Sequence, residues 1–344
     1  MTTGTAAIGI VAHLDGSGST TFLLTIPALL PLYRALGISR YILITIVIVA
    51  LAASVMNMVP WAGPLGRAGA VIAQEPSDIW LRLLPIQGVA VVLVLVVAAG
   101  LGLQRRRRIA ARGAATADVE ASQAQQDEER REEGYSYRTG TACTVANVAV
   151  VLVALVILLA GLLPPAPTFL IATTLALLIN FPDSHSQSKV LRRHAPNALS
   201  MAGIIIAAAM FLGVLNETGM LEQIALSLVS VLPAAVGPYL HVIVGLLGVP
   251  LDLLTSTDAH YFSVLPIVQE TAASFGVSGM STALALIIGN VIGTFVSPFS
   301  PALWLALGLA GGANMGRYIK LAFPIAWAFS AALVLVAFAF GMLG

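Results

Sequence analysis

Apolar runs long enough to cross a membrane constrain this chain more than any other feature. A helix needs about 20 mostly apolar residues to span the hydrocarbon core of a bilayer. Four runs meet this length without interruption: Tyr41–Met58, Leu83–Leu103, Cys143–Leu163 and Leu321–Leu343. Other runs are shorter or broken: Thr168–Phe181, Leu199–Leu215, Val242–Leu254, Thr282–Phe295 and Ala302–Leu309. This mixture predicts an all-α, polytopic (multi-pass) protein of a cell (inner) membrane, with complete and broken helices in the lipid bilayer.

Composition supports the membrane assignment and excludes other classes of protein. Apolar residues make up 58% of the chain and charged residues 10%, whereas soluble domains carry about 45–50% and about 25%. The formal net charge of +1 argues against a nucleic-acid partner, since phosphate binding requires clustered basic surface. The single cysteine, Cys143, has no second cysteine for a disulfide or a metal site.

The basic residues favour one orientation in the membrane. Lys and Arg concentrate on the cytoplasmic side of short loops. With Arg105–Arg108 in the cytoplasm, alternation of the spans places Gln74–Ser77 and the Lys- and Arg-free loop Gln269–Gly279 outside. The other basic positions then fall inside: Arg34, Arg40, Lys189, Arg192, Arg193, Arg317 and Lys320.

Two regions resemble each other across the charged segment that separates them. The first has the polar patch Leu14–Phe22, an apolar stretch to Pro27, a span, and the Gly/Pro-rich Met56–Pro64. The second repeats this order with Leu254–Phe262, Pro266, a span, and Gly289–Pro298. By the predicted topology the first patch is approached from the cytoplasm and the second from outside. The two regions are therefore predicted to be inverted repeats.

Inverted repeats with broken helices are typical of secondary transporters. Polar, irregular backbone at membrane depth is tolerated where it lines a protein-enclosed cavity, so each patch is predicted to be the tip of a re-entrant helical hairpin. We predict a first repeat over residues 1–103, a charged cytoplasmic linker over 104–140, and a complete second repeat over 141–344. The first patch has no spans before it, so the first repeat is expected to be N-terminally incomplete by about two or three spans.

Charged side chains at membrane depth are costly and therefore point to function. The candidates for proton or cation coupling are Asp258, His260, Asp15 and Asp252, because a carboxylate can hold a proton or a hard cation and an imidazole changes charge near neutral pH. His13 and Glu217 are weaker candidates. As an alternative, Asp258 caps a helix N-terminus.

Hydroxyl and amide side chains in the patches suit an anionic substrate, since they donate hydrogen bonds to carboxylate oxygens. Ser and Thr also serve as helix caps and interhelical contacts. No basic cluster lines the patches, so a polyanion would meet Asp15 and Asp258 unless a divalent cation entered with it. The predicted substrate-binding residues are Ser17, Ser19, Thr20, Thr21, Asn57, Ser256, Thr257, Asn290 and Thr294.

Five motifs carry a family resemblance: Leu14–Phe22, Pro27–Tyr33, Met56–Pro64, Phe211–Met220 and Thr255–Phe262. Here the chain resembles the citrate–divalent metal:proton symporter family of the ion-transporter superfamily. The resemblance implies proton-coupled uptake of citrate complexed with Mg or Ca, by an elevator-like movement, with Asp15 and Asp258 near the metal. The family usually carries a second aspartate where Ser17 stands, so no metal or proton role is expected of Ser17.

The predicted function is therefore secondary transport of metal-complexed citrate, with no resident cofactor and with the divalent cation carried as cargo. Elevator-type relatives are commonly dimers, which suggests a homodimer by analogy. A transporter of another anion (a dicarboxylate, gluconate or an oxyanion), driven by protons or sodium, is the alternative within the class. An intramembrane enzyme and a non-functional truncated remnant are the alternatives outside it. The sequence contains no His-Glu-x-x-His motif, which would have supported an intramembrane metalloenzyme.

Overall fold

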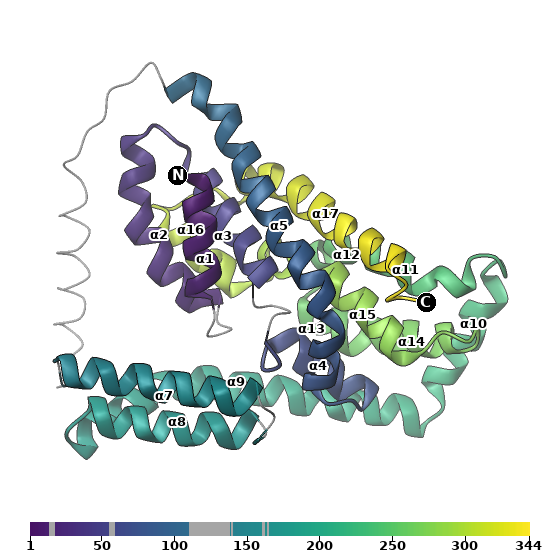
Figure 1. Ribbon diagram of the computed structural model, residues 1–344. Helices are drawn as coiled ribbons and strands as arrows, with labels where there is room; N and C mark the ends of the chain where they lie inside the picture. The colour runs from purple at the N-terminus through teal and green to yellow at the C-terminus, as the bar shows by residue number, and fades with distance from the viewer. Residues whose placement is uncertain (14–17, 55–58, 110–137, 139, 160–161, 164) are drawn as a thin grey trace. The chain divides into compact units, whose positions relative to one another are not determined.

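The computed structural model describes residues 1–13, 18–54, 59–109, 138, 140–159, 162–163 and 165–344 (Figure 1). Within these ranges the chain forms helices and no strand. Three of the described helices are long and apolar enough to cross a membrane, over Pro76–Leu103, Thr141–Leu158 and Met315–Ala339. A fourth span is possible by length if the bent pair Gly237–Leu246 and Gly248–Leu254 is one unit. The prediction of an all-α membrane protein with complete and broken helices is confirmed.

The described helices fall into two compact units. The core unit comprises Met1–Gln123 and Leu212–Gly344, and the small unit comprises Ala124–Phe211. In the small unit, α7 (Thr141–Leu159) packs along α8 (Pro165–Asn180), as Figure 1 shows. Asn147 and Asn180 join these two helices through reciprocal amide hydrogen bonds of 2.8 Å. The long helix α9 (Ser184–Glu217) begins in the small unit and ends in the core unit.

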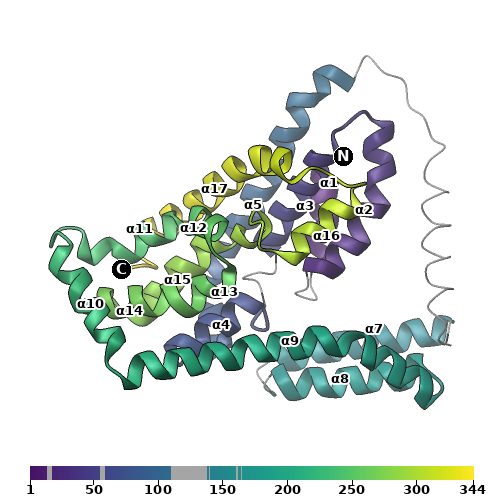
Figure 2. The ribbon, with the colours of Figure 1, turned by 180° about the vertical axis from the view of Figure 1, so that it is seen from behind.

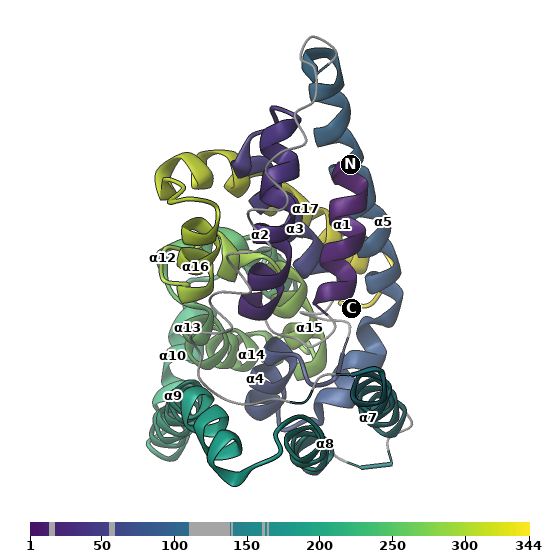
Figure 3. The same cartoon turned by 90° about the vertical axis from the view of Figure 1, so that its left-hand side faces the viewer.

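The first repeat supplies five helices of the core unit. They are α1 (Thr2–Ala12), α2 (Gly18–Ala35), α3 (Arg40–Ser54), α4 (Gly63–Ile72) and α5 (Pro76–Ile109). The hairpin helices α1 and α2 both pack on α3, and Figure 3 shows the three together. α3 covers the predicted span Tyr41–Met58 as far as Ser54, and residues 55–58 lie outside the described ranges. α5 carries the Arg105–Arg108 run as a helical extension of the span, where we expected the linker to begin.

The second repeat has the same order with more interruptions. After α10 (Met220–Val231) and the 3-10 turn η1 (Gly237–Tyr239), helices α11 (Leu240–Leu246) and α12 (Gly248–Leu254) form the entering arm of the hairpin, with a 63° bend between them. The returning arm contains α13 (Thr257–Ala259), the π-helical turn η2 (His260–Val264) and α14 (Leu265–Ala273). The remaining elements are α15 (Gly279–Asn290), η3 (Gly293–Phe295), α16 (Pro301–Leu309) and α17 (Met315–Ala339).

Corresponding helices of the two repeats make corresponding contacts. α1 packs on α3 and α5, as α11 packs on α15 and α17. The repeats also exchange elements, because α4 contacts η2 of the second hairpin while α16 contacts α2 of the first, the latter visible in Figure 2. The long helices α5 and α17 run side by side (Figure 1). The predicted inverted repeats with re-entrant hairpins are therefore found in the fold.

Glycines permit close backbone approach between the second hairpin and α15. A Cβ atom at Gly245 would lie 2.7 Å from the carbonyl oxygen of Ala285. One at Gly248 would lie 2.5 Å from the carbonyl group of Gly289, and Gly289 in turn lies against the backbone of Gly245. Small residues allow such approaches between membrane helices. The bent arm, α11 and α12, therefore packs closely against the part of α15 that leads to Asn290.

Basic residues predicted to share the cytoplasmic side gather at one end of the core unit. Arg40 Nη1 donates to the carbonyl oxygens of Ala310 and Gly311 at 3.1 and 2.7 Å. The hydroxyl of Tyr41 accepts from the backbone N–H of Asn314 at 3.2 Å, three residues before Arg317. The loops that precede α3 and α17 therefore lie together.

Candidate functional site

The tips of the two hairpins converge on the short turn η3. Thr294 Oγ1 is 2.6 Å from Thr257 Oγ1 of the second hairpin. The next residue, Phe295, packs edge-on against Phe22 of the first hairpin, with ring centroids 5.5 Å apart. A Cβ atom at Gly18 would lie 2.8 Å from the same Phe295 ring. The break in the second repeat's helix is therefore where both tips meet.

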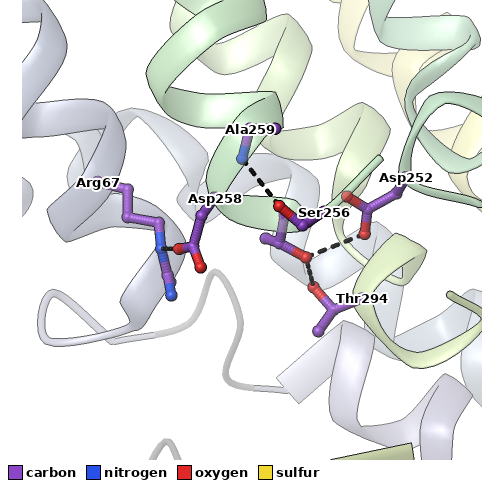
Figure 4. Close-up of polar contacts among 7 residues, drawn as sticks. Arg67, Asp252, Ser256, Asp258, Ala259 and Thr294 are labelled. Carbon is purple, nitrogen blue, oxygen red and sulfur yellow. Dashed lines mark hydrogen bonds and ion pairs between the residues drawn. The ribbon is translucent and has the colours of Figure 1, made fainter. Parts of the chain in front are cut away.

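The second tip is an extended turn closed by a helix cap. Ser256 has extended backbone, and its Oγ accepts a hydrogen bond from the backbone N–H of Ala259 at 3.2 Å (Figure 4). A serine before a helix commonly satisfies an otherwise unpaired N–H in this way. The cap is therefore Ser256, and the alternative reading of Asp258 as the cap is wrong. The Ser256 hydroxyl therefore stabilises the turn at the tip.

Thr257 ties the tip to two neighbouring segments. Its Oγ1 donates to Asp252 Oδ2 at 3.0 Å and contacts Thr294 Oγ1 (Figure 4). Asp252 is completely buried, and its Oδ1 has no hydrogen-bond partner among the described residues. Gly293 leaves room for this carboxyl, because a Cβ there would lie 2.7 Å from Asp252 Cβ.

Asn290 lies beside this carboxyl at the end of α15. Its side-chain amide lies close enough to the Asp252 carboxyl to interact with it. Its Nδ2 nevertheless has no partner in hydrogen-bonding geometry within the described part of the chain. Both residues are buried. Unpaired buried polar atoms are rare and are typical of sites that hold a ligand, an ion or water. The structure therefore brings together four of the predicted residues: Asp252, Thr257, Asn290 and Thr294.

Arg67 is the functional candidate that sequence reasoning missed. It lies on α4, and its Nε donates to Asp258 Oδ1 at 2.7 Å (Figure 4). We expected the carboxylates of the patches to lack compensating arginines, and for Asp258 this expectation is wrong. A sequence signal existed, because Arg67 is a charged residue directly after the broken-helix motif Met56–Pro64. The repeats alone did not indicate it, since the matching helix α16 has no charged residue.

The first tip is described only in part. Asp15, Ser17 and Asn57 lie outside the described residues. Thr21 is fully buried, and its Oγ1 is 2.8 Å from Nδ1 of His13, so it joins the two arms of the hairpin. Ser19 and Thr20 are exposed. Of the described hydroxyls here, Thr21 joins the two arms of the hairpin, and Ser19 and Thr20 are exposed.

His260 lies inside the second hairpin, in the π-helical turn. It is fully buried, its ring stacks edge-on with Tyr261 at 5.3 Å, and its Nε2 is 3.4 Å from the carbonyl oxygen of Leu286. Within the described residues no side-chain hydrogen bond joins the His260 imidazole to Thr257 or Asp258. Glu217 is exposed at the end of α9.

Protein side chains alone do not form a metal site in the described residues. No group of three or more His, Cys, Asp or Glu side chains is found there in a metal-binding arrangement. Asp258 and Asp252 are carboxyls near the second tip, and Arg67 pairs with Asp258. Within the described residues, side chains alone would therefore not complete the coordination shell of a cation at Asp258.

Matched hairpins, broken helices and a buried polar cluster are typical of membrane transporters. Across residues 1–289 the chain matches the model of the CitMHS citrate transporter family. The chain belongs to this family, and it is a membrane transporter and not an enzyme.

Named relatives agree with this family. A citrate transporter of Bacillus subtilis is 33% identical over 96% of this chain and 74% of its own. An Mg(2+)/citrate complex secondary transporter of the same organism is 32% identical over 98% of this chain and 75% of its own. The crystal structure of the Alcanivorax borkumensis YdaH transporter has the same fold, with a TM-score of 0.66 and 16% identity over 99% of this chain and 79% of the other.

Proposed function

We propose that this transporter carries citrate as a complex with a divalent cation such as Mg or Ca, coupled to protons. The observation that carries the proposal is the convergence of both hairpin tips on Thr294 and Phe295, beside a polar cluster with unpaired buried atoms. Two of the named relatives are a citrate transporter and an Mg(2+)/citrate complex transporter. Polar groups at the meeting point of inverted repeats are where substrates of such transporters bind.

The substrate would lie between the tips. Carboxylate oxygens would accept hydrogen bonds from hydroxyls and amides of both repeats, and the cation would lie near Asp258 and Asp15. The proposed substrate-binding residues remain Ser17, Ser19, Thr20, Thr21, Asn57, Ser256, Thr257, Asn290 and Thr294. The structure supports Thr257, Asn290 and Thr294 best, because they surround Asp252, whereas Thr21 is engaged with His13.

Proton coupling is proposed for Asp258, with His260, Asp15 and Asp252 as further candidates. Asp258 is one-third exposed and pairs with a residue of the other repeat. Such a carboxylate can exchange a proton or a cation while the contact between repeats changes. If Asp258→Asn kept full proton-coupled citrate uptake, this assignment would be wrong.

The larger organisation is also part of the proposal. Residues 1–103 and 141–344 would be the two repeats, joined by the charged linker 104–140 on the cytoplasmic side of a cell membrane. The gathering of Arg40 with the 310–314 loop supports this orientation. A homodimer is proposed by analogy with elevator-type transporters.

The test is uptake of radiolabelled citrate by proteoliposomes that contain the purified chain. Uptake would be measured with Mg, with Ca and with EDTA, each with and without an inward proton gradient. Metal-stimulated uptake that the gradient accelerates is the expected result. Uptake that responds to a sodium gradient alone would show that sodium is the coupling ion. Competition by a dicarboxylate, gluconate or an oxyanion, with none by citrate, would show that the substrate is another anion.

A further inference from the structure

An ion pair joins the two repeats at the second hairpin tip. Arg67 belongs to α4 of the first repeat and Asp258 to the hairpin of the second, and their 2.7 Å contact spans 191 positions of sequence. The Arg67 side chain is 15% exposed and that of Asp258 is 33% exposed. Both charges are therefore within reach of a ligand, but in a partly dehydrated setting where charges interact more strongly than in water.

Charges of both signs at this point restrict what can bind there. A free polycarboxylate would gain Arg67 but would face Asp258, with buried Asp252 close by. A free divalent cation would gain Asp258 but would face Arg67. A ligand that engages one of these charges gives up the contact between them and meets a like charge beside it, at a cost of about fivefold or more in affinity. A ligand that brings both signs avoids this penalty.

We infer that a metal–citrate complex opens the Arg67–Asp258 pair and occupies both halves of it. The divalent cation binds the Asp258 carboxylate, and a citrate carboxylate of the same complex binds the Arg67 guanidinium. The inference rests on the proposed function and adds to it the residue that recognises the anion. One ion pair is exchanged for two oppositely directed contacts, so neither protein charge is left unpaired.

The local structure suits Arg67 for this role. Its guanidinium folds back over the first turn of α4, where a Cβ atom at Gly63 would lie 2.7 Å from Nη1. This turn has no side-chain cap. The glycine leaves space for the planar guanidinium, which can bind a carboxylate through two parallel hydrogen bonds.

The neighbouring tip residues support the assignment of the cation to Asp258. Ser256 caps the helix and Thr257 is bonded to Asp252 and Thr294. Among the described residues the partner of the Asp258 carboxylate is Arg67, from outside its own hairpin. Asp258 is therefore the carboxylate of the tip that a ligand can engage without dismantling the turn.

The test is equilibrium binding of radiolabelled citrate to the purified full chain, with excess Mg and with EDTA. Arg67→Gln is expected to weaken binding of citrate in Mg by about a hundredfold, and Arg67→Lys by about tenfold, because lysine keeps the charge without the planar fork. Asp258→Asn is expected to remove the advantage of Mg, so that citrate binds equally in both buffers. Its affinity in EDTA should rise by about tenfold over wild type, since the Asp258 carboxylate then no longer repels citrate or competes with it for Arg67.

Arg34→Gln and Asp78→Asn are the matched controls, because both residues are exposed and distant in sequence from the tips. Size-exclusion profiles establish that each variant is folded. If Arg67→Gln does not fold, Arg67→Lys still tests the role of Arg67. Wild-type affinity in Mg for both Arg67 variants, or an unchanged Mg advantage in Asp258→Asn, would overturn the exchange while leaving the proposed function intact. Wild-type protein that binds no citrate in either buffer would overturn both.

Discussion

The two hairpins share one plan but differ in how their tips are held. In the first, α2 runs as one helix over Gly18–Ala35 despite Pro27 and Pro31, and the described tip contact is between His13 and Thr21. In the second, both arms are interrupted, by a 63° bend on one side and by a π-helical turn on the other. Its tip is linked to its own entering arm through Asp252, and outward to Thr294 and Arg67.

This difference shows that duplicated topology does not duplicate chemistry. α4 brings a charge to the second tip through Arg67, whereas the corresponding α16 reaches the first hairpin with no charged side chain. π-helical turns within helices are frequent at functional sites. The described part of the second hairpin thus carries the ionic contact of the site. Two pairs of substitutions compare the hairpins directly, a third experiment tests the ionic contact, and a fourth lies outside both hairpins.

The largest expected effect is at the backbone contact between the second hairpin and α15. Gly289→Ala should lower the free energy of unfolding by about 3 kcal/mol, because the new methyl group meets the backbone of Gly245. Gly9→Ala, at the corresponding α1–α3 contact, should cost no more than about 1 kcal/mol, since its methyl group meets Ala50 Cβ at 3.0 Å and alanine favours the helix.

Thermal unfolding in detergent measures both variants, with Gly88→Ala, which has open space around it, as the control. Equal losses of unfolding free energy for Gly289→Ala and Gly9→Ala would show that the two hairpins pack equally closely on α15 and α3.

The hydroxyls at the two tips should differ by a smaller amount. Thr257→Val removes the hydrogen bond to buried Asp252 and the contact with Thr294, for an expected loss of about 2 kcal/mol. Thr21→Val removes the contact with His13, for about 1 kcal/mol. The Thr→Ser variants keep the hydroxyls and should restore most of each loss. A larger loss at Thr21 than at Thr257 would contradict the ranking.

The Arg67–Asp258 pair should contribute modestly to stability despite its role in binding. A double-mutant cycle of Arg67→Gln and Asp258→Asn should give a coupling energy of about 1 kcal/mol, because both side chains are partly exposed. Unfolding of the two single variants and the double variant measures it. Coupling of several kcal/mol would mean that the pair is too costly to be opened by a ligand.

The smallest effect lies outside both hairpins, at the start of α9. Hydrogen bonds from the backbone and side chain of Ser186 lower the pKa of Asp183 below its ordinary value of 3.8. A lowered pKa in the folded state stabilises the helix end above the ordinary value, and this stabilisation is lost as the pH falls through the lowered pKa. The protection factor of the Ser186 amide in hydrogen exchange, which corrects for the intrinsic pH dependence of exchange, should therefore fall in acid. Asp183→Asn keeps an acceptor but should lose the pH dependence; retention of it would assign the effect elsewhere.

Much of this protein was determined by the sequence itself. Apolar runs, paired polar patches and basic loops are local patterns of membrane insertion, because each span and each loop must separately satisfy the bilayer. The sequence therefore predicted the helices, the two repeats, and Asp252, Thr257, Asn290 and Thr294 as members of a site.

Only the tertiary structure decided how these residues are paired. Arg67 meets Asp258 because the repeats exchange helices, and no local pattern encodes a contact between residues 191 positions apart. The structure also distinguished two threonines with similar places in the repeats. Thr21 contacts His13 within its own hairpin, whereas Thr257 contacts both Asp252 and Thr294. A side chain's partners depend on which backbones pack together, and here Gly245, Gly248 and Gly289 set that packing through contacts visible only in the fold.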